Sequence, residues 1–215
     1  MTIIYDCEQG SEEWYQARMG IPTASEFSTV LAKPQKDNRY SKTRRTYLLK
    51  LAGERLTGLP MESYTNAYME RGKLIEPEAR SLYQFSRDVE LQQVGFIRNE
   101  TMGCSPDALI GEDGGVEFKS ALRHILIEHI LKDIFPAEHY AQCQGGMLVS
   151  GRKWWDLAIY SPGLPLFVKR AERDDDYCAM LQKEIDQFNA ELDFTVDLVN
   201  RYGRPIKADL EASLT

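Results

Sequence analysis

The chain has 215 residues, of which 43% are hydrophobic and 27% charged, and its formal net charge is −7. These values are typical of one soluble globular domain, and no apolar run approaches the roughly 20 residues of a membrane-spanning helix. The first ten residues, MTIIYDCEQG, have neither the basic start nor the apolar core of a secretory signal, so we expect a cytoplasmic protein. The four cysteines are scattered without a Cys-x-x-Cys pair, which argues against a zinc site.

Charge is distributed unevenly along the chain. Between residues 33 and 57, eight Lys or Arg stand against two acidic residues, and between residues 172 and 193 eight Asp or Glu stand against two basic ones. Total charge is a poor guide to DNA binding, because binding depends on where the charges lie. The basic segment alone is typical of a solvated helix face, and it becomes a candidate DNA contact only beside a catalytic site.

The first part of the chain, about residues 10–86, is predicted to be helical. Capping residues and apolar periodicity indicate four helices, over residues 11–19, 23–32, 41–56 and 64–85. The second begins at Thr23-Ala24-Ser25-Glu26, which has the pattern of a capping box. Pro77 follows Glu76 in the fourth helix, and an internal proline costs about 3 kcal/mol, so we expect a kink or boundary there.

The part over about residues 88–170 alternates strand and helix patterns. We expect strands over 89–98, 155–160 and 166–170, a hairpin over 104–120, a helix over 137–148, and a helix or a mobile segment over 121–133. Residues 174–201 have the pattern of a long acidic amphipathic helix. The prediction is therefore a single α/β domain over residues 1–215, with a central mixed sheet of about five strands flanked by helices.

The hairpin, CSPDALIGEDGGVEFKS, contains the first candidate site. An Asp-Gly turn between two apolar runs is a strong hairpin signal. Side chains alternate faces along a strand, so Glu117 and Lys119 share one face. The turn is expected to bring Asp107 opposite roughly residues 118–120. Two carboxylates beside an ammonium are typical of a site for a hard divalent cation.

Taken alone, these three residues are more often a solvated ion pair on a strand face. Glu76 in the helical segment upstream, and Gln142 and Gln144 in the one downstream, favour a functional site. The two glutamines lie two positions apart on a helix, so they cannot share a face. Glu76 alone is typical of a surface residue.

A second candidate site lies near the start of the chain. Ser25 is at the predicted start of a helix, which is either ordinary capping or a place where backbone N–H groups bind phosphate. Arg18, a few residues earlier, is a suitable bidentate partner for phosphate. Trp14 is expected to lie in the core.

Four segments together show a family resemblance. Pro106-Asp107 followed by Glu117-Phe118-Lys119 resembles the signature of the PD-(D/E)XK nucleases. WYQARMGIPTASEF, ERGKLIEPEARSLY, CSPDALIGEDGGVEFK and YAQCQGGM resemble blocks of the lambda-type (YqaJ-like) viral recombinase exonucleases, in the same order and at similar separations. The resemblance spans about residues 10–170 and implies the restriction-endonuclease-like core of that superfamily.

The resemblance implies a role for several residues. Two Mg²⁺ ions, for which Mn²⁺ can substitute, would be held by Asp107, Glu117, Glu76 and a backbone carbonyl near Phe118. Lys119 and Gln144 would position the attacking water. A pocket for the 5′-terminal phosphate would consist of Arg18, Ser25 and Ser105, and other DNA contacts would be made by the wedge residue Met69, by Lys33 and by Lys36. Gln35 stands where the family has an arginine that probes the duplex, so that contact differs here.

The resemblance also implies an activity and partners. The expected enzyme is a Mg²⁺-dependent 5′-to-3′ exonuclease on double-stranded DNA ends with a 5′-phosphate. It would release 5′-mononucleotides and leave 3′ single-stranded overhangs, as a ring-shaped homotrimer that works with a single-strand annealing protein in the bacterial host cytoplasm. The alternatives are a restriction-type endonuclease of the same fold, a catalytically inert DNA-end-binding protein, and an acidic structural protein that binds neither metal nor DNA.

Overall fold

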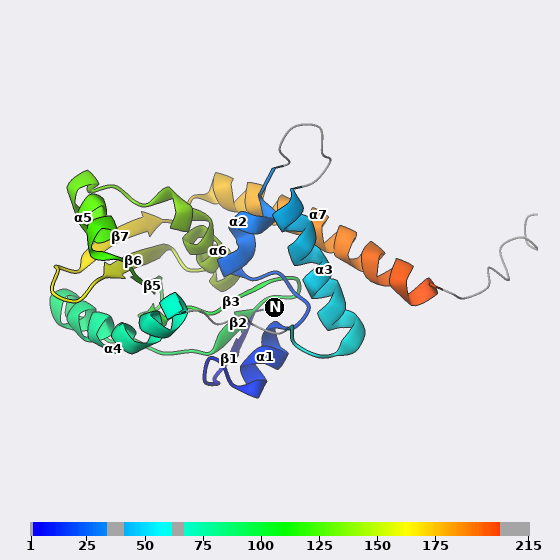
Figure 1. Ribbon diagram of the computed structural model, residues 1–215, viewed down its shortest axis with the longest axis horizontal. Coiled ribbons are helices and arrows are strands. Elements are labelled where there is room, and N and C mark those ends of the chain that lie inside the picture. Colours follow the sequence, from blue (N-terminus) through cyan, green and yellow to red (C-terminus); the bar gives the residue numbers. More distant parts are fainter. Residues whose placement is uncertain (1, 34–40, 62–66, 203–215) are drawn as a thin grey trace, which may run out of the picture.

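The computed structural model describes residues 2–33, 41–61 and 67–202, without the side chains of residues 67–73. Gln35 and Lys36, and the side chain of Met69, therefore lie outside the described part of the chain. The described residues form a mixed α/β structure in which helices surround two small sheets (Figure 1). None of the described helices has the length and apolar character of a membrane span.

The larger sheet has four strands in the order β4-β5-β6-β7: β4 (Ala108–Ile110), β5 (Gly114–Ser120), β6 (Trp154–Tyr160) and β7 (Phe167–Glu172). Only β5 and β6 are parallel, so the sheet is mixed as predicted. It has four strands in the described residues, instead of about five, because β1 (Ile3–Tyr5), β2 (Phe96–Arg98) and β3 (Gly103–Cys104) form a separate antiparallel sheet. Of the predicted strand over 89–98, only β2 forms, with one bridge from Gln92 to Leu109.

The helices follow the predicted segments closely. They are α1 (Glu12–Arg18), α2 (Phe27–Val30), α3 (Lys42–Thr57), α4 (Ala67–Arg87), α5 (Arg123–Lys132), α6 (Tyr140–Ser150) and α7 (Asp175–Arg201). The capping box at Thr23 is wrong. The Thr23 side chain makes no capping hydrogen bond, and its hydroxyl lies 3.3 Å from that of Ser25, at the start of a 3-10 turn, η1 (Ala24–Glu26).

Helix α4 continues through Pro77, so the predicted boundary beside Glu76 does not occur. The packing of the helix explains this, because Ala79 and Tyr83 are buried against β5 and β6. The Tyr83 hydroxyl also donates a 2.6 Å hydrogen bond to Asp156, which anchors the second half of the helix to β6. These contacts offset the backbone hydrogen bond that a proline removes.

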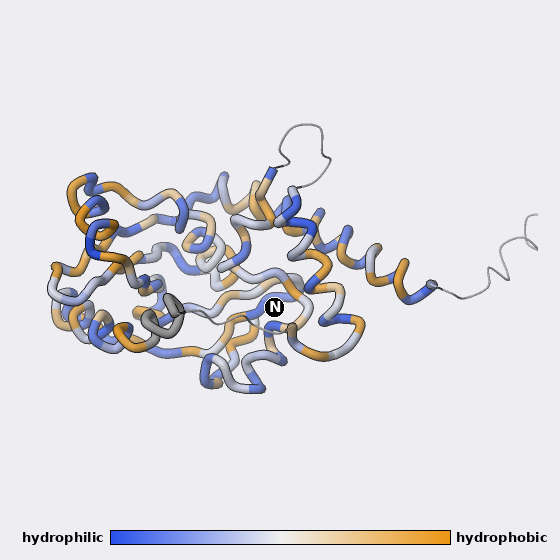
Figure 2. The backbone as a smooth tube through the Cα atoms, viewed as in Figure 1, coloured by the Kyte–Doolittle hydropathy of each residue, from blue (hydrophilic) through white to orange (hydrophobic). Residues whose placement is uncertain are grey.

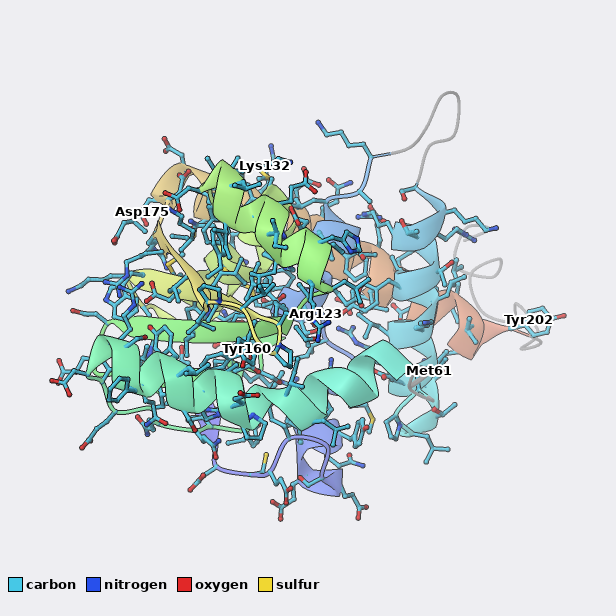
Figure 3. The ribbon with its side chains drawn as sticks, turned by 60° about the vertical axis from the view of Figure 1, so that its left-hand side comes forward. Met61, Arg123, Lys132, Tyr160, Asp175 and Tyr202 are labelled. Carbon is cyan, nitrogen blue, oxygen red and sulfur yellow. The ribbon has the colours of Figure 1, made fainter. Side chains whose placement is uncertain are left out.

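The larger sheet is covered on both faces. Figures 1 and 3 show α4 along one side of it and α5 along the other. On the face away from α4, Trp155, Leu157 and Ile159 of β6 belong to the main core, together with Met147 of α6 and Leu181 of α7. Colouring by hydropathy shows α7 alternating between hydrophilic and hydrophobic residues along its length (Figure 2), as expected for its amphipathic pattern.

The basic and acidic segments of the sequence pack on each other. Helix α3 lies beside α7 (Figure 1), and Arg44 forms a two-pronged ion pair with Glu191. Arg55 of α3 forms a second ion pair, with Asp193 of α7. Two of the cations predicted as candidate DNA contacts therefore stabilise the fold, while Lys42, Arg45 and Lys50 of α3 remain exposed.

The close approach of α6 to η1 depends on Gly145. A Cβ atom at this position would lie 2.3 Å from Phe27 Cδ2 and 3.3 Å from Ala24 Cβ, and Phe27 is fully buried. We therefore expect Gly145→Ala to lower the free energy of unfolding, measured by urea denaturation, by about 1–3 kcal/mol. Gly53→Ala in α3 is the control, because its Cβ would meet only Met61 Sδ at 3.7 Å. Equal effects of the two substitutions would contradict the prediction.

Candidate active site

The β4–β5 hairpin sets the position of the first two carboxylates. Ala108 pairs with Val116, so Asp107 lies next to Glu117 in register and not opposite residues 118–120 as expected from the sequence. The reason is the short connection over 111–113, which shifts the pairing. The Asp107 side chain nevertheless reaches Phe118, because its Oδ2 accepts the Phe118 backbone N–H at 2.6 Å.

Glu117 and Lys119 form a partly buried ion pair. Lys119 Nζ lies 2.7 Å from Glu117 Oε1, and the Glu117 side chain is only 8% exposed. Gln142 Nε2 donates a second hydrogen bond of 2.6 Å to the same oxygen. A solvated surface pair does not have this burial or this third partner, so that alternative does not describe the site.

The electrostatics of these groups are strongly coupled. Burial raises the pKa of Asp107 well above its usual range, and the neighbouring charge of Glu117 raises it further. Burial alone lowers the pKa of the Lys119 ammonium, but the Glu117 and Asp107 carboxylates outweigh it, so that the net pKa is raised. Without a further cation, Asp107 and Glu117 are thus two close carboxylates with one ammonium between them.

Glu76 reaches the site from α4. Arg80, one turn later, donates from Nη2 to Glu76 Oε1 at 2.8 Å and from Nη1 to the Asp107 carbonyl at 3.0 Å. The charge of Glu76 also contributes to the raised pKa of Asp107. The Arg80 contacts thus link Glu76 to the hairpin, in agreement with the prediction that Glu76 faces it.

Asp107, Glu117 and Glu76 offer oxygen donors of the type that binds a hard divalent cation, but in the described part of the chain the three do not come together as one cluster. Each of Asp107, Glu117 and Glu76 has one oxygen bonded to a protein donor, and among the described residues the other oxygen has none. Oxygen ligands of this kind are those that Mg²⁺ and Ca²⁺ prefer. Within the described residues, no three His, Cys, Asp or Glu side chains are close enough to form a metal site by themselves. The ligand set would therefore include a backbone carbonyl, such as that of Phe118, and water.

A cavity of about 170 Å³ connects Asp107 and Glu117 with the second predicted site, while Glu76 does not line it. Its lining includes Asp107, Glu117, Lys119 and Gln142 together with Arg18, Ser25 and Ser105, and with Gln9, Trp14 and Thr23. Residues from α1, η1, the segment after β3, β5 and α6 thus meet in one place. Asp107, Glu117 and Lys119 thus lie in the same cavity as the predicted phosphate pocket, whose residues come from a separate part of the sequence.

Trp14 contacts two of the predicted phosphate-binding residues in the cavity. The Arg18 guanidinium lies 4.0 Å from the centre of the Trp14 ring, and the indole N–H donates a 2.8 Å hydrogen bond to Ser105 Oγ. Burial lowers the pKa of Arg18, and no described residue accepts a hydrogen bond from its guanidinium. A desolvated cation with free donors beside two serine hydroxyls is suited to an anion such as phosphate. Trp14 is thus only partly a core residue.

The two glutamines of α6 have different surroundings. Gln144 is fully buried, donates to the Glu172 carbonyl at 2.8 Å and accepts the Asp174 N–H at 3.0 Å. It holds the start of α7 and does not line the cavity, so its expected placement beside the carboxylates is wrong. Gln142 occupies that place. The sequence showed that only one of the two could face the site, and the helix phase determines which.

The remaining predicted DNA contacts are Lys33, Lys36 and Met69. Lys33 is exposed at the end of a described segment and does not line the cavity. Lys36 and the side chain of Met69 are outside the described residues. Sequence reasoning missed Arg80 and Gln9, whose Nε2 donates to the Pro106 carbonyl at 2.9 Å. The spacing of four between Glu76 and Arg80 was the available signal for the first.

Comparison with known proteins gives two kinds of match. The family model of the YqaJ-like viral recombinase domain matches residues 13–153. LHK-Exo, an alkaline exonuclease from Laribacter hongkongensis, is 34% identical, with a TM-score of 0.80, and the match covers 89% of this chain and 97% of that one. The structure of LHK-Exo in complex with dAMP gives the same values. No protein with a curated description matches the chain.

A more distant structure shows the same fold. A phage-related exonuclease from Haemophilus somnus 129PT is 14% identical over 86% of this chain and 99% of that one, with a TM-score of 0.65. The mixed sheet flanked by helices is thus the fold of PD-(D/E)XK-type exonucleases. The segment matched by the family model includes the cavity residues Arg18, Asp107, Glu117 and Lys119. With this match over more than half of its length and a relative aligned over nearly all of it, the chain belongs to the YqaJ-like viral recombinase domain family.

Proposed function

We propose that the protein is a Mg²⁺-dependent exonuclease that degrades double-stranded DNA from 5′-phosphorylated ends, in the 5′-to-3′ direction. The observation that carries this proposal is one cavity whose lining contains both a carboxylate–lysine cluster and Arg18, Ser25 and Ser105. An anchor for a terminal phosphate at a fixed distance from a hydrolytic cluster selects the bond next to the end. The product would be a 5′-mononucleotide and the remaining strand a 3′ overhang. The dAMP complex of LHK-Exo supports a mononucleotide product.

Asp107, Glu117, Glu76 and the Phe118 carbonyl would hold the divalent ions in this proposal. When bound, such ions activate water and neutralise charge on the phosphate during hydrolysis. Mn²⁺, which prefers similar ligands, is expected to substitute. The roles of the individual residues are part of the proposal and are supported by the family resemblance and by the contacts described above.

Lys119 and Gln142 would act on the attacking water and on the charge that develops. The Lys119 ammonium is held by Glu117 and its pKa is raised, so it is a cation at neutral pH that can stabilise negative charge on the phosphate. Gln142 donates to the same Glu117 oxygen and so keeps the carboxylate oriented. At the other end, Arg18 would bind the 5′-phosphate, with Ser25 and Ser105 as further donors.

Three further features are proposed from the family resemblance. The enzyme would act as a ring-shaped homotrimer around DNA, would supply 3′ overhangs to a single-strand annealing protein, and would work in the cytoplasm of a bacterial host. A ring keeps an enzyme on its substrate without high affinity for DNA, which suits a chain of net charge −7. Sedimentation of the purified protein with and without duplex DNA would measure the oligomeric state.

The test of the proposed function uses a linear duplex with a 5′-phosphate at one end and a 5′-hydroxyl at the other. With Mg²⁺ we expect shortening of the phosphorylated strand and release of 5′-mononucleotides, and with EDTA no cleavage. Internal cutting of a closed circle would identify an endonuclease of the same fold. Binding to DNA ends without cleavage under any divalent ion would identify an inert end-binding protein.

The two glutamines of α6 give a paired prediction. Gln142→Leu removes a hydrogen bond that orients Glu117, so we expect the hydrolysis rate to fall about 10- to 100-fold. The free energy of unfolding should stay unchanged. Gln144→Leu leaves the Glu172 carbonyl and the Asp174 N–H without partners, so we expect the free energy of unfolding to fall by about 2–4 kcal/mol. Hydrolysis rates per folded molecule and urea denaturation measure both. A larger rate loss for Gln144→Leu would reverse the assignment.

A further inference from the structure

Arg80 is the one cation, among the described residues, that contacts Glu76 and the Asp107 backbone together. Nη2 donates to Glu76 Oε1 at 2.8 Å, and Nη1 donates to the Asp107 carbonyl at 3.0 Å. The guanidinium carbon also lies 5.3 Å from the centre of the Phe118 ring. The Arg80 side chain is 16% exposed, whereas that of Glu76 is 36% exposed. The Arg80 side chain is thus more enclosed by neighbouring residues than the Glu76 side chain that it binds.

These contacts connect α4 with the residue before β4. The backbone between these two elements does not by itself fix the distance between them. Glu76 is on α4, while Asp107 precedes β4. A glutamate side chain with this exposure has several rotamers of similar energy, and its carboxylate is ordered only if a partner holds it. A planar guanidinium donates two hydrogen bonds in a fixed geometry, so it fixes both of its acceptors at once. Arg80 therefore sets where the Glu76 carboxylate lies relative to Asp107.

One oxygen of each carboxylate is held by a protein donor. Arg80 uses one oxygen of Glu76, and the Phe118 N–H uses Oδ2 of Asp107. In the described residues, the second oxygen of each carboxylate has no donor. An arrangement in which outer partners hold one oxygen and leave the other for a cation is typical of residues that orient metal ligands.

We propose that Arg80 is a positioning residue for the second divalent cation, fixing Glu76 and Asp107 at the separation at which both can bind it. This inference rests on the proposed function, since it takes these carboxylates as cation ligands. Arg80 itself would contact neither the cation nor the DNA. Its loss should weaken the cation site that uses Glu76 and leave the site at Glu117 nearly unchanged, because Glu117 is held by Lys119 and Gln142.

The experiment is a titration of the full-length protein with Mn²⁺, without DNA, followed by the electron paramagnetic resonance signal of free Mn²⁺. The wild-type protein is expected to bind two ions in two steps. For Arg80→Met we expect one step to weaken about 10- to 100-fold and the other to change less than threefold. For Arg80→Lys we expect an intermediate loss, because one ammonium cannot reproduce the planar fork.

Arg87→Met is the matched control, because Arg87 is an exposed arginine two turns further along α4 and does not line the cavity. Its Mn²⁺ binding should equal that of the wild type. Thermal unfolding in EDTA is measured for every variant, since a merely structural role of Arg80 would lower the melting temperature and weaken both steps alike.

The outcomes distinguish failure of this inference from failure of the proposed function. Two unchanged binding steps in Arg80→Met would overturn the inference while leaving the proposed function intact. Tighter binding in Arg80→Met would also overturn it, because Arg80 would then compete with the cation. Equal weakening of both binding steps would indicate a structural effect and overturn the inference. Full recovery of binding in Arg80→Lys would indicate a charge effect alone and overturn it too. A wild-type protein that binds no Mn²⁺ would refute the proposed function itself.

Discussion

Asp107→Asn is expected to lower Mg²⁺-dependent hydrolysis of a 5′-phosphorylated duplex by at least ~10³-fold, because it removes a charged cation ligand worth several kcal/mol of stabilisation in the transition state. The substitution keeps the shape of the side chain, and its oxygen can still accept the Phe118 N–H. Single-turnover digestion of a radiolabelled duplex would measure the loss, with equal fractions of folded protein verified by circular dichroism.

The same variant should not lose stability. The raised pKa of Asp107 means that the folded protein favours the neutral carboxyl, so above the usual pKa of aspartate the charged form destabilises the fold. Asparagine is neutral at every pH, and the melting temperature of Asp107→Asn in EDTA at pH 7 should equal or exceed that of the wild type. A lower melting temperature together with a partial loss of hydrolysis would indicate a structural role. Wild-type hydrolysis by this variant would refute the metal-site assignment.

Arg18→Ala is expected to lower the rate on 5′-phosphate ends about 10- to 100-fold, because a charge-assisted hydrogen bond contributes about 1.5–3 kcal/mol. The rate on 5′-hydroxyl ends should stay the same, since such an end offers no terminal phosphate to the guanidinium. The two substrates would therefore be degraded at similar rates. Initial rates on duplexes that differ only in their 5′ group measure this.

The control for this prediction is Arg45→Ala, which removes an exposed arginine of α3 that does not line the cavity. It should leave the ratio of the two rates unchanged. Loss of activity on both kinds of end after Arg18→Ala would place Arg18 in general DNA binding or in the fold, and would count against a pocket for the terminal phosphate.

The sequence predicted the local structure of this protein well. The helix over about residues 11–19, the strands β6 and β7 and the acidic helix α7 are all confirmed, because each depends on capping or periodicity within a short segment. The family is confirmed as well, since four blocks in a fixed order are far more specific than one motif. The functional roles of the individual residues stay predictions.

The errors concern relations that short-range patterns do not determine. The register of Asp107 was missed because the hairpin connection could have held two or three residues. Gln144 was chosen over Gln142 because periodicity shows that they face apart and not which one faces Glu117. The contact of Arg80 with Asp107 joins residues 27 positions apart in the chain, and no local rule predicts it.

The pairing of α3 with α7 has a consequence for how the protein meets DNA. Since Arg44 and Arg55 are neutralised by Glu191 and Asp193, they release no counterions from a duplex. The logarithm of the DNA-binding constant changes with the logarithm of salt concentration by about 0.9 for each phosphate neutralised, so we expect these two arginines to add nothing to that slope. The preference for an end would come from the cavity and not from the field of the whole chain.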